Sequence, residues 1–301
     1  MKRILLFILL ISHQAFSQEL LISNPVSFLA LGDSYTIGQG VAEEERWPEQ
    51  LAERLRGEGM EAEVEIIATT GWTTRDLING MDANPPEQTF YNLVSLLIGV
   101  NNQFQRRTQE EYRAEFEQLL IRAINLARGE TSNVLVLSIP DYAFTPFGQG
   151  FSNVSDEIDQ FNAINKSITA SYQVSYIDIT DISRRGLDEP ELVANDGLHP
   201  SGLMYTEWVQ RIMERATLNS LVTSLKPELS SQSNIYPNPA SDYVTIPSAN
   251  GSEIMIYSYE GRLIKRARGK ERISLKELPS GTYLLKWDEG LRTRTESFIK
   301  L

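Results

Sequence analysis

Ser34 is the first residue whose type and position could do chemistry, because it closely follows an apolar segment. Residues 26–31 are almost all apolar, as expected of a parallel strand that is buried on both faces. Gly32 permits a sharp turn, and ligands of open α/β sheets bind just beyond the carboxyl ends of the strands. Ser34 is therefore a candidate nucleophile. The alternative is that Asp33 and Ser34 only cap the segment that follows.

His199 is the second candidate. The chain has two histidines, His13 and His199, and no cysteine. His13 lies in a predicted secretory signal peptide, residues 1–17, which combines a basic start, an apolar run and a small-residue cleavage site. The mature chain would keep His199 as its single imidazole, which makes it the predicted general base. Without cysteine there is no disulfide, no thiolate metal site and no cysteine nucleophile.

The elements that must position these side chains alternate between strands and helices. This alternation predicts a parallel sheet with helices on both faces, that is, a three-layer α/β/α sandwich. Five strands favour the flavodoxin-like strand order 2-1-3-4-5. The predicted strands are 26–31, 64–68, 93–98, 134–139 and 174–179, and the predicted helices are 46–56, 74–79, 110–128, 156–172 and 202–215.

In that strand order, the loops after several strands converge on one crevice. Gly71 follows the second predicted strand, and Asn101 follows the third. Acyl transfer needs hydrogen-bond donors for a developing oxyanion. The backbone N–H groups of Ser34 and Gly71 and the side-chain amide of Asn101 would supply them. Gly71 could also be a simple turn glycine.

Asp196 completes the set, because it lies three residues before His199 and could hold the imidazole in one tautomer. Pro200 disfavours helical geometry at His199 and so helps to fix the ring. The alternative is that Asp196 and Gly197 form only a turn, with His199 as a capping residue of the last helix.

Taken together, four sequence blocks resemble the SGNH family, also called GDSL-type esterases and lipases. The blocks are Gly32-Asp33-Ser34-Tyr35, Gly71, Gly99-Val100-Asn101-Asn102 and Asp196-Gly197-Leu198-His199-Pro200. The resemblance spans roughly residues 26–216. It implies a three-layer α/β/α fold and ester hydrolysis through an acyl-serine, with no metal and no cofactor. Asn102 stands where the family commonly has Asp, and the G-x-S-x-G elbow of ordinary α/β-hydrolases is absent at Ser34.

Beyond residue 225 the composition changes. Residues 226–233 read as a Ser- and Pro-containing linker, and residues 234–301 show short alternating runs that are typical of a small β-sandwich. This segment carries 11 Lys+Arg and 8 Asp+Glu, whereas the whole chain has a formal charge of −12. The asymmetry supports two units: a catalytic domain at 18–225 and a C-terminal domain at 234–301 that folds independently. The acidic balance argues against a nucleic-acid partner.

The C-terminal domain has a resemblance of its own, to the sorting domains of type IX secretion. Its blocks are Tyr236-Pro237-Asn238-Pro239-Ala240, Gly261-Arg262, Leu278-Pro279-Ser280-Gly281-Thr282-Tyr283 and Phe298-Ile299-Lys300-Leu301. The resemblance implies the type IX secretion machinery as a partner and a secreted or cell-surface location reached through the periplasm. A carbohydrate-binding or spacer β-sandwich is the alternative.

These features predict a secreted serine esterase that acts on small or carbohydrate-linked acyl esters. Two alternatives stay open: a lysophospholipase or thioesterase acting on longer acyl chains, and a non-catalytic binding protein on the same fold. Four aromatic residues either line an acyl or sugar pocket or pack within loops, namely Phe104, Tyr142, Phe144 and Phe147.

Overall fold

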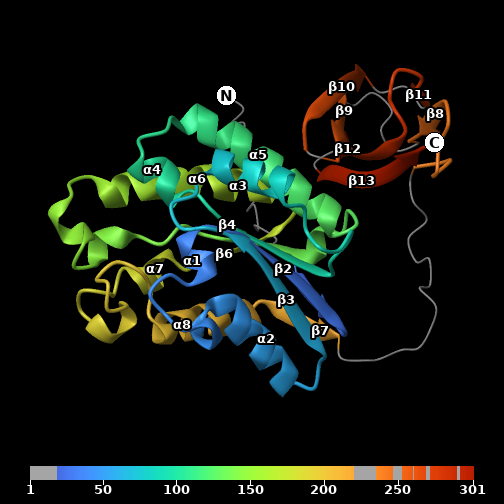
Figure 1. Ribbon diagram of the computed structural model, residues 1–301. Helices are drawn as coiled ribbons and strands as arrows, with labels where there is room; N and C mark the ends of the chain where they lie inside the picture. Colours follow the sequence, from blue (N-terminus) through green and yellow to red (C-terminus); the bar gives the residue numbers. More distant parts are fainter. Residues whose placement is uncertain (1–18, 220–234, 247–252, 260, 269–271, 290–291) are drawn as a thin grey trace, which may run out of the picture.

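The computed structural model describes residues 19–219, 235–246, 253–259, 261–268, 272–289 and 292–301 (Figure 1). The predicted signal peptide at 1–17 and the predicted linker at 226–233 lie outside these ranges. The described residues form a larger α/β part and a smaller all-β part. Among them, no helix combines the length and the apolar character that spanning a membrane requires.

Five parallel strands form the central sheet of the larger part, as predicted. Their order across the sheet is β3-β2-β4-β5-β6, which is 2-1-3-4-5 when these strands are counted along the chain. The strands are β2 (Val26–Gly32), β3 (Ala62–Ala68), β4 (Leu93–Leu97), β5 (Val134–Leu137) and β6 (Ser175–Ile177). Every residue of β4 and β5 is buried, since helices cover both faces of the sheet, whereas the edge strand β3 is only partly buried.

Helices lie on the two faces of this sheet, which confirms the three-layer sandwich (Figure 1). On one face α5 contacts both α3 and α6, and on the other α2 packs against α8. Their bounds are α2 (Trp47–Gly57), α3 (Thr74–Ala83), α5 (Gln109–Leu126), α6 (Val154–Ser171) and α8 (Gly202–Met213). Trp47 of α2 and Trp208 of α8 are completely buried in one layer, and Tyr112 of α5 is completely buried in the other.

Several short elements were not predicted. They include a two-stranded parallel sheet in which β1 (Leu20–Ser23) pairs with β7 (Ala216–Asn219). The others are the helices α1 (Ser34–Ile37), α4 (Val100–Phe104) and α7 (Thr180–Ser183) and the 3₁₀ turns η1 (Glu43–Glu45), η2 (Thr131–Asn133), η3 (Tyr142–Phe144), η4 (Gly148–Gly150) and η5 (Pro190–Leu192). Elements of three to five residues are too short to show a hydrophobic period in the sequence.

The C-terminal part is all-β, as predicted. A four-stranded antiparallel sheet has the order β10-β9-β12-β13, and β11 pairs with β8 in a second, two-stranded sheet. The bounds are β8 (Tyr243–Thr245), β9 (Glu253–Ser258), β10 (Leu263–Arg268), β11 (Arg272–Ser274), β12 (Gly281–Glu289) and β13 (Arg292–Lys300). Side chains of both sheets form a separate hydrophobic core, which includes Val244, Ile256, Ile273 and Trp287.

The all-β part also contacts the helices of the larger part. Lys286 of β12 is 8% exposed, and its Nζ lies 3.6 Å from Glu117 Oε1 of α5 and 3.5 Å from the centre of the Tyr172 ring. Tyr257 and Leu284 belong to the hydrophobic cluster of the larger part. The all-β part therefore has its own core but shares an interface with the α/β part.

Candidate active site

The candidate residues lie at one end of the sheet, just after the carboxyl ends of its strands. In the sheet register, Gly32 of β2 pairs with the last residue of β3 and with the last residue of β4. Ser34, Gly71 and Asn101 follow these three strand ends within a few residues, at the edge where open α/β sheets bind ligands. The packing at Gly32 leaves no room for a side chain, because a Cβ there would lie 2.6 Å from the carbonyl oxygen of Leu97.

Ser34 is the first residue of α1, and Asp33 is the N-cap of that helix. Asp33 Oδ1 accepts a hydrogen bond of 3.0 Å from the backbone N–H of Tyr35. The capping role considered for Asp33 is therefore correct, but it uses only the Asp33 side chain. The Ser34 hydroxyl forms no hydrogen bond with any described residue, and the residue is 5% exposed. A capped helix start and a nucleophile are thus compatible here.

The carboxyl group of Asp33 is almost fully buried, at 1% exposure, and its Oδ2 has no hydrogen-bond partner among the described residues. Burial raises the pKa of Asp33 to about 7, although hydrogen bonds from the backbone of Tyr35, Asp33 and Gly99 act in the opposite direction. A carboxyl group that titrates near neutral pH therefore lies directly before Ser34.

Asp196 and His199 lie together on one tight turn. Asp196 Oδ2 is 2.7 Å from His199 Nδ1, and Oδ1 accepts hydrogen bonds from the backbone N–H groups of Leu198 and His199 at 2.9 and 3.0 Å. The turn requires a φ of 72° at Gly197, which glycine adopts at little cost. The turn considered for these residues is thus present, and it brings the carboxylate to the imidazole. Ser201, not His199, caps α8.

The ionised Asp196 carboxylate favours the tautomer of His199 that carries its proton on Nδ1. Burial acts to raise the pKa of Asp196, but hydrogen bonds from His199 and Leu198 outweigh it and hold this pKa below its ordinary value. The carboxylate is therefore charged near neutral pH and holds the ring proton on Nδ1. That tautomer leaves Nε2 as the basic nitrogen.

Tyr35 connects the two parts of the site. It follows Ser34 in α1, and the centre of its ring lies 5.7 Å from that of the His199 imidazole in an edge-on arrangement. The segment after α1 also approaches the turn, since a Cβ at Gly40 would lie 3.1 Å from Asp196 Oδ2. No hydrogen bond joins Ser34 to His199 in the described part of the chain; such bonds commonly tighten only when substrate is bound. No sequence pattern predicts that Tyr35 or Gly40 approaches the turn that carries Asp196 and His199, because both contacts come from the tertiary fold.

Gly71 and Asn101 occupy neighbouring loops. Gly71 has a φ of 85° in the turn after β3, and its backbone N–H donates to no described residue. Asn101 Nδ2 donates a hydrogen bond of 3.0 Å to the carbonyl oxygen of Trp72, which uses one of its two amide hydrogens. Gln105 Nε2 donates to the Gly71 carbonyl at 3.2 Å and further ties the two loops together. The second amide hydrogen of Asn101 is available for another acceptor.

Asn102, which departs from the family pattern, is completely buried and supports this loop. Its Oδ1 accepts from the Thr74 N–H at 3.0 Å, and its Nδ2 donates to Thr74 Oγ1 at 2.7 Å. Thr74 Oγ1 in turn donates to Glu115 Oε2 at 2.5 Å. A carboxylate at position 102 would lie close to that of Glu115, so the neutral amide suits this environment.

The groups at this edge of the sheet are a hydroxyl, an imidazole held by a carboxylate, and amide donors. This set is suited to acyl transfer, which needs a nucleophile, a base and oxyanion donors. Within the described ranges, no group of acidic and histidine side chains is arranged to hold a metal ion.

Comparisons with known proteins agree with this chemistry. Residues 30–206 match the GDSL-like lipase/acylhydrolase family, and residues 234–301 match a secretion system C-terminal sorting domain. The sorting domain indicates secretion or attachment to the cell surface. A comparison with curated proteins gives no match.

Solved structures share the fold of the larger part. A catalytic mutant of an acetylxylan esterase from Geobacillus stearothermophilus aligns with a TM-score of 0.53 and 16% identity, over 64% of this chain and 95% of that chain. An alpha/beta hydrolase enzyme from the metagenome of Lake Arreo, Spain, gives 0.51 and 17%, over 64% and 96%. TesA gives 0.50 and 19%, over 62% and 96%. Since the family match covers more than half of the chain, this protein belongs to the GDSL-like lipase/acylhydrolase family and is an ester hydrolase.

Proposed function

We propose that this protein is a secreted serine esterase that hydrolyses small or carbohydrate-linked acyl esters through an acyl-serine intermediate. One observation carries the proposal: the Asp196 carboxylate lies 2.7 Å from His199 Nδ1. In addition, the imidazole ring lies against the ring of Tyr35, the residue that follows Ser34. This arrangement supplies a base whose free nitrogen is on the side of the ring away from Asp196. Ser34 is the hydroxyl residue adjacent to that ring contact.

In the acylation step, Ser34 Oγ attacks the carbonyl carbon of the ester while His199 Nε2 takes the hydroxyl proton. Asp196 keeps its hydrogen bond to Nδ1 and stabilises the imidazolium that forms. The negative charge moves to the carbonyl oxygen, where the N–H groups of Ser34 and Gly71 and the free amide hydrogen of Asn101 stabilise it. When the tetrahedral intermediate collapses, the imidazolium protonates the leaving alcohol and the acyl group stays on Ser34.

Deacylation repeats the same proton transfers with water. His199 takes a proton from water as the hydroxide equivalent attacks the acyl carbon, and the same donors stabilise the second oxyanion. The imidazolium then returns the proton to Ser34 Oγ, which releases the carboxylic acid. No group outside this set is needed to balance the reaction.

The proposed catalytic residues do not define the acyl and alcohol parts of the substrate, which must be inferred from other features. Esterases with this fold include the acetylxylan esterase noted above, which supports a short acyl group on a carbohydrate. Three exposed phenylalanines close to the site, Phe104, Phe147 and Phe151, instead favour the alternative of a longer acyl chain, as in a lysophospholipase or thioesterase. A non-catalytic binding protein is the third possibility.

A series of p-nitrophenyl esters from acetate to decanoate tests these assignments. We expect turnover to be highest for short acyl groups, and we expect Ser34→Ala and His199→Ala each to remove most of it, by up to about 10⁶-fold in kcat. The combined variant should be no worse than either single variant, and Asp196→Ala should lose less. Near-native turnover by Ser34→Ala would end the assignment, and folded wild-type protein without any turnover would favour the binding protein.

For export, we infer that the type IX secretion machinery recognises residues 234–301 after the chain has reached the periplasm. The match of this segment to a secretion system sorting domain supports the inference. In the native host, truncation after Ser231 should leave the enzyme in the periplasm, which cell fractionation would detect. Normal export of the truncated chain would instead favour a binding or spacer role for the domain.

A further inference from the structure

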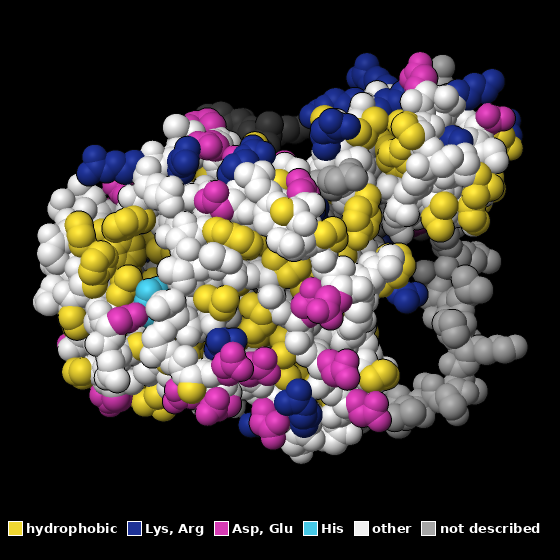
Figure 2. Space-filling view, viewed as in Figure 1, with side chains coloured by type: hydrophobic (Ala, Val, Ile, Leu, Met, Phe, Trp, Pro, Cys, Tyr) yellow, Lys and Arg dark blue, Asp and Glu magenta, His cyan; other side chains and the backbone are white. Residues whose placement is uncertain are grey.

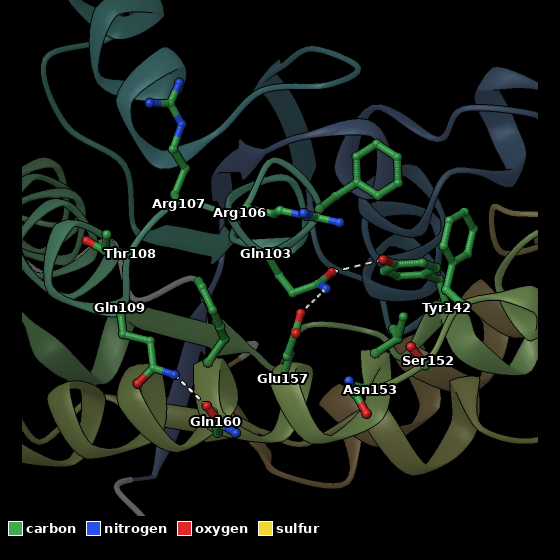
Figure 3. Close-up of a pocket in the computed structure, with 14 residues that line it drawn as sticks. Gln103, Arg106, Arg107, Thr108, Gln109, Tyr142, Ser152, Asn153, Glu157 and Gln160 are labelled. Carbon is green, nitrogen blue, oxygen red and sulfur yellow. Dashed lines mark hydrogen bonds between the residues drawn. The ribbon is translucent and has the colours of Figure 1, made fainter.

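A pocket of about 760 Å³ opens between α4, the loop before α6 and the first turns of α6 (Figure 3). Its volume is within the range of small-molecule sites. Two connections place it beside the proposed reaction centre. The helix α4 holds Asn101 and, one turn later, Phe104, which lines the pocket. Tyr142 lines both this pocket and a small cavity against His199.

Three phenylalanine rings form an exposed cluster along this region. Phe104, Phe147 and Phe151 are 50, 43 and 50% exposed, and the ring of Phe147 lies 6.3 Å from that of Phe104 and 5.4 Å from that of Phe151. The Phe147 N–H donates to the Gly197 carbonyl at 2.9 Å, which ties the cluster to the turn that carries the imidazole. Figure 2 shows a hydrophobic patch next to the histidine on this face. Clustered exposed apolar side chains mark binding surfaces.

The interior of the pocket is polar. Gln103 is 7% exposed; its Oε1 accepts from the Tyr142 hydroxyl at 3.0 Å, and its Nε2 donates to Glu157 Oε2 at 2.6 Å (Figure 3). These bonds hold the Glu157 carboxylate in the pocket and leave its other oxygen without a partner among the described residues. The position of Glu157 is therefore fixed, and half of its hydrogen-bonding capacity is available.

Arg106 supplies a charge of the opposite sign. Its φ of 58° is the left-handed conformation in which α4 ends, and the Arg107 N–H donates back to the Asn102 carbonyl at 2.8 Å. In that conformation the side chain extends over the pocket from the end of α4 (Figure 3). Its guanidinium forms no ion pair with any residue that the structure describes.

We infer that this pocket binds the sugar part of a carbohydrate ester, with the acyl carbonyl placed at Ser34. The inference rests on the proposed function and narrows its substrate class. A pyranose ring has apolar C–H faces, which suit Phe104 and Phe151, and a rim of hydroxyl groups, which suit Glu157 and Arg106 through charge-assisted hydrogen bonds. A long acyl chain would remove these two charges from water without replacing their hydrogen bonds, which is unfavourable.

The test compares two acetyl esters that differ only in the alcohol. The substrates are partially acetylated xylo- and manno-oligosaccharides on one side and p-nitrophenyl acetate on the other. Phe151→Ala and Glu157→Gln should each lower kcat/KM for the acetylated oligosaccharides about 10-fold, mainly through KM, as the loss of one aromatic or charged contact predicts. Activity on p-nitrophenyl acetate should stay within about twofold. The control is Tyr236→Ala, which removes an exposed aromatic ring of the C-terminal domain and should change neither activity.

Calorimetric titration with unacetylated xylotetraose and mannotetraose separates this inference from the proposed function. Saccharide binding by the wild type that weakens in Phe151→Ala supports the pocket even if no ester is hydrolysed, in which case only the esterase proposal fails. Hydrolysis of p-nitrophenyl acetate without binding of either saccharide overturns the inference. It is also overturned if Phe151→Ala impairs only p-nitrophenyl decanoate, because the pocket would then hold an acyl chain.

Discussion

The Asp33 side chain combines a structural task with an unusual ionisation. Its Oδ1 caps α1, while its Oδ2 is buried without a partner among the described residues. A neutral, protonated carboxyl group fits such a place better than a carboxylate, which explains why burial raises the pKa of Asp33 to about 7. The residue before the proposed nucleophile should therefore make the stability of the fold depend on pH.

The sign of this dependence follows from the two pKa values. In the unfolded chain Asp33 loses its proton near its ordinary pKa of 3.8, whereas in the folded protein it keeps the proton to about 7. Between these values the folded state binds more protons, so its stability falls as pH rises, by about 1.4 kcal/mol per pH unit. Asn also caps helices well and does not titrate. Asp33→Asn should therefore remove this slope and be favoured, relative to wild type, above pH 7.

Urea unfolding of the two proteins at intervals from pH 4 to pH 8 measures the difference directly, because the contributions of other groups cancel. The control is Asp242→Asn, which changes an acidic residue of the C-terminal domain. Parallel stability curves for Asp33→Asn and wild type would show that Asp33 is ionised in the folded protein at neutral pH.

At the scale of the elements, three helices meet at one buried polar chain. Asn102 of α4 bonds Thr74 at the start of α3, and Thr74 bonds Glu115 of α5. Arg75 offsets the Glu115 charge at 2.8 Å but is itself half exposed. The loop that holds Asn101 is therefore positioned by helices that are distant in sequence.

Asn102→Asp should weaken this junction, although Asp is common at this place in the family. The change removes the donor to Thr74 Oγ1 and puts a second carboxylate near Glu115, so we expect a loss of about 1–3 kcal/mol in the free energy of unfolding. The loss should shrink in the Asn102→Asp/Glu115→Gln double variant, because the charge repulsion is then absent. Equal stability of Asn102→Asp and wild type, measured by urea unfolding, would contradict this account.

The long elements and the strand order could be predicted because their apolar runs are dictated by burial on both faces, as in β2 and β4. The polar residues proposed for the site were predicted from their places after those strands and from the resemblance of four blocks, and their catalytic roles stay a prediction. Tyr35 against His199 and the Asn102 junction could not be predicted, because each depends on tertiary contacts. The short β1–β7 pair was not predicted for another reason: strands of four residues are too short to show a clear hydrophobic alternation in the sequence.

At the scale of the whole molecule, the C-terminal domain has a hydrophobic core of its own, and its independent folding stays a prediction. Its contact with α5 and α6 goes beyond the expectation. Lys286 lies against Glu117 and the Tyr172 ring, and Asn125 Nδ2 donates to the Tyr259 carbonyl at 3.0 Å. The sequences of the two parts predict that their net charges are opposite. They do not predict which residues form the contact between them.

Truncation after Ser231 should therefore lower the melting temperature of the catalytic domain, by about 2–4 °C for each kcal/mol of lost contact. Lys286→Glu in the full chain should have a similar effect, because it places a carboxylate beside Glu117. Its control is Lys265→Glu, since Lys265 pairs with the exposed Glu277 within the C-terminal domain. Activity on p-nitrophenyl acetate at 25 °C should not change, because the interface contains none of the proposed catalytic residues.

Differential scanning calorimetry of these variants measures how much the interface contributes to the melting temperature. An unchanged melting temperature after truncation would show that the interface adds nothing to stability, as for two units joined only by a linker. A loss of activity at 25 °C would show that the domain also supports the site.

The turn that holds both Asp196 and His199 has a consequence for how the site can fail. A triad drawn from three distant segments has two gaps that can open separately, whereas here the proposed base and its proposed orienting carboxylate lie within four residues on one turn, so we expect them to move together. The geometry of the proposed triad then depends mainly on one distance, that between the Asp196–His199 turn and α1. The Tyr35 ring lies between the two and sets this distance. Heat, a bulky inhibitor or a substitution in a nearby loop can increase the distance between His199 and Ser34. None of them can easily separate the His199 imidazole from the Asp196 carboxylate.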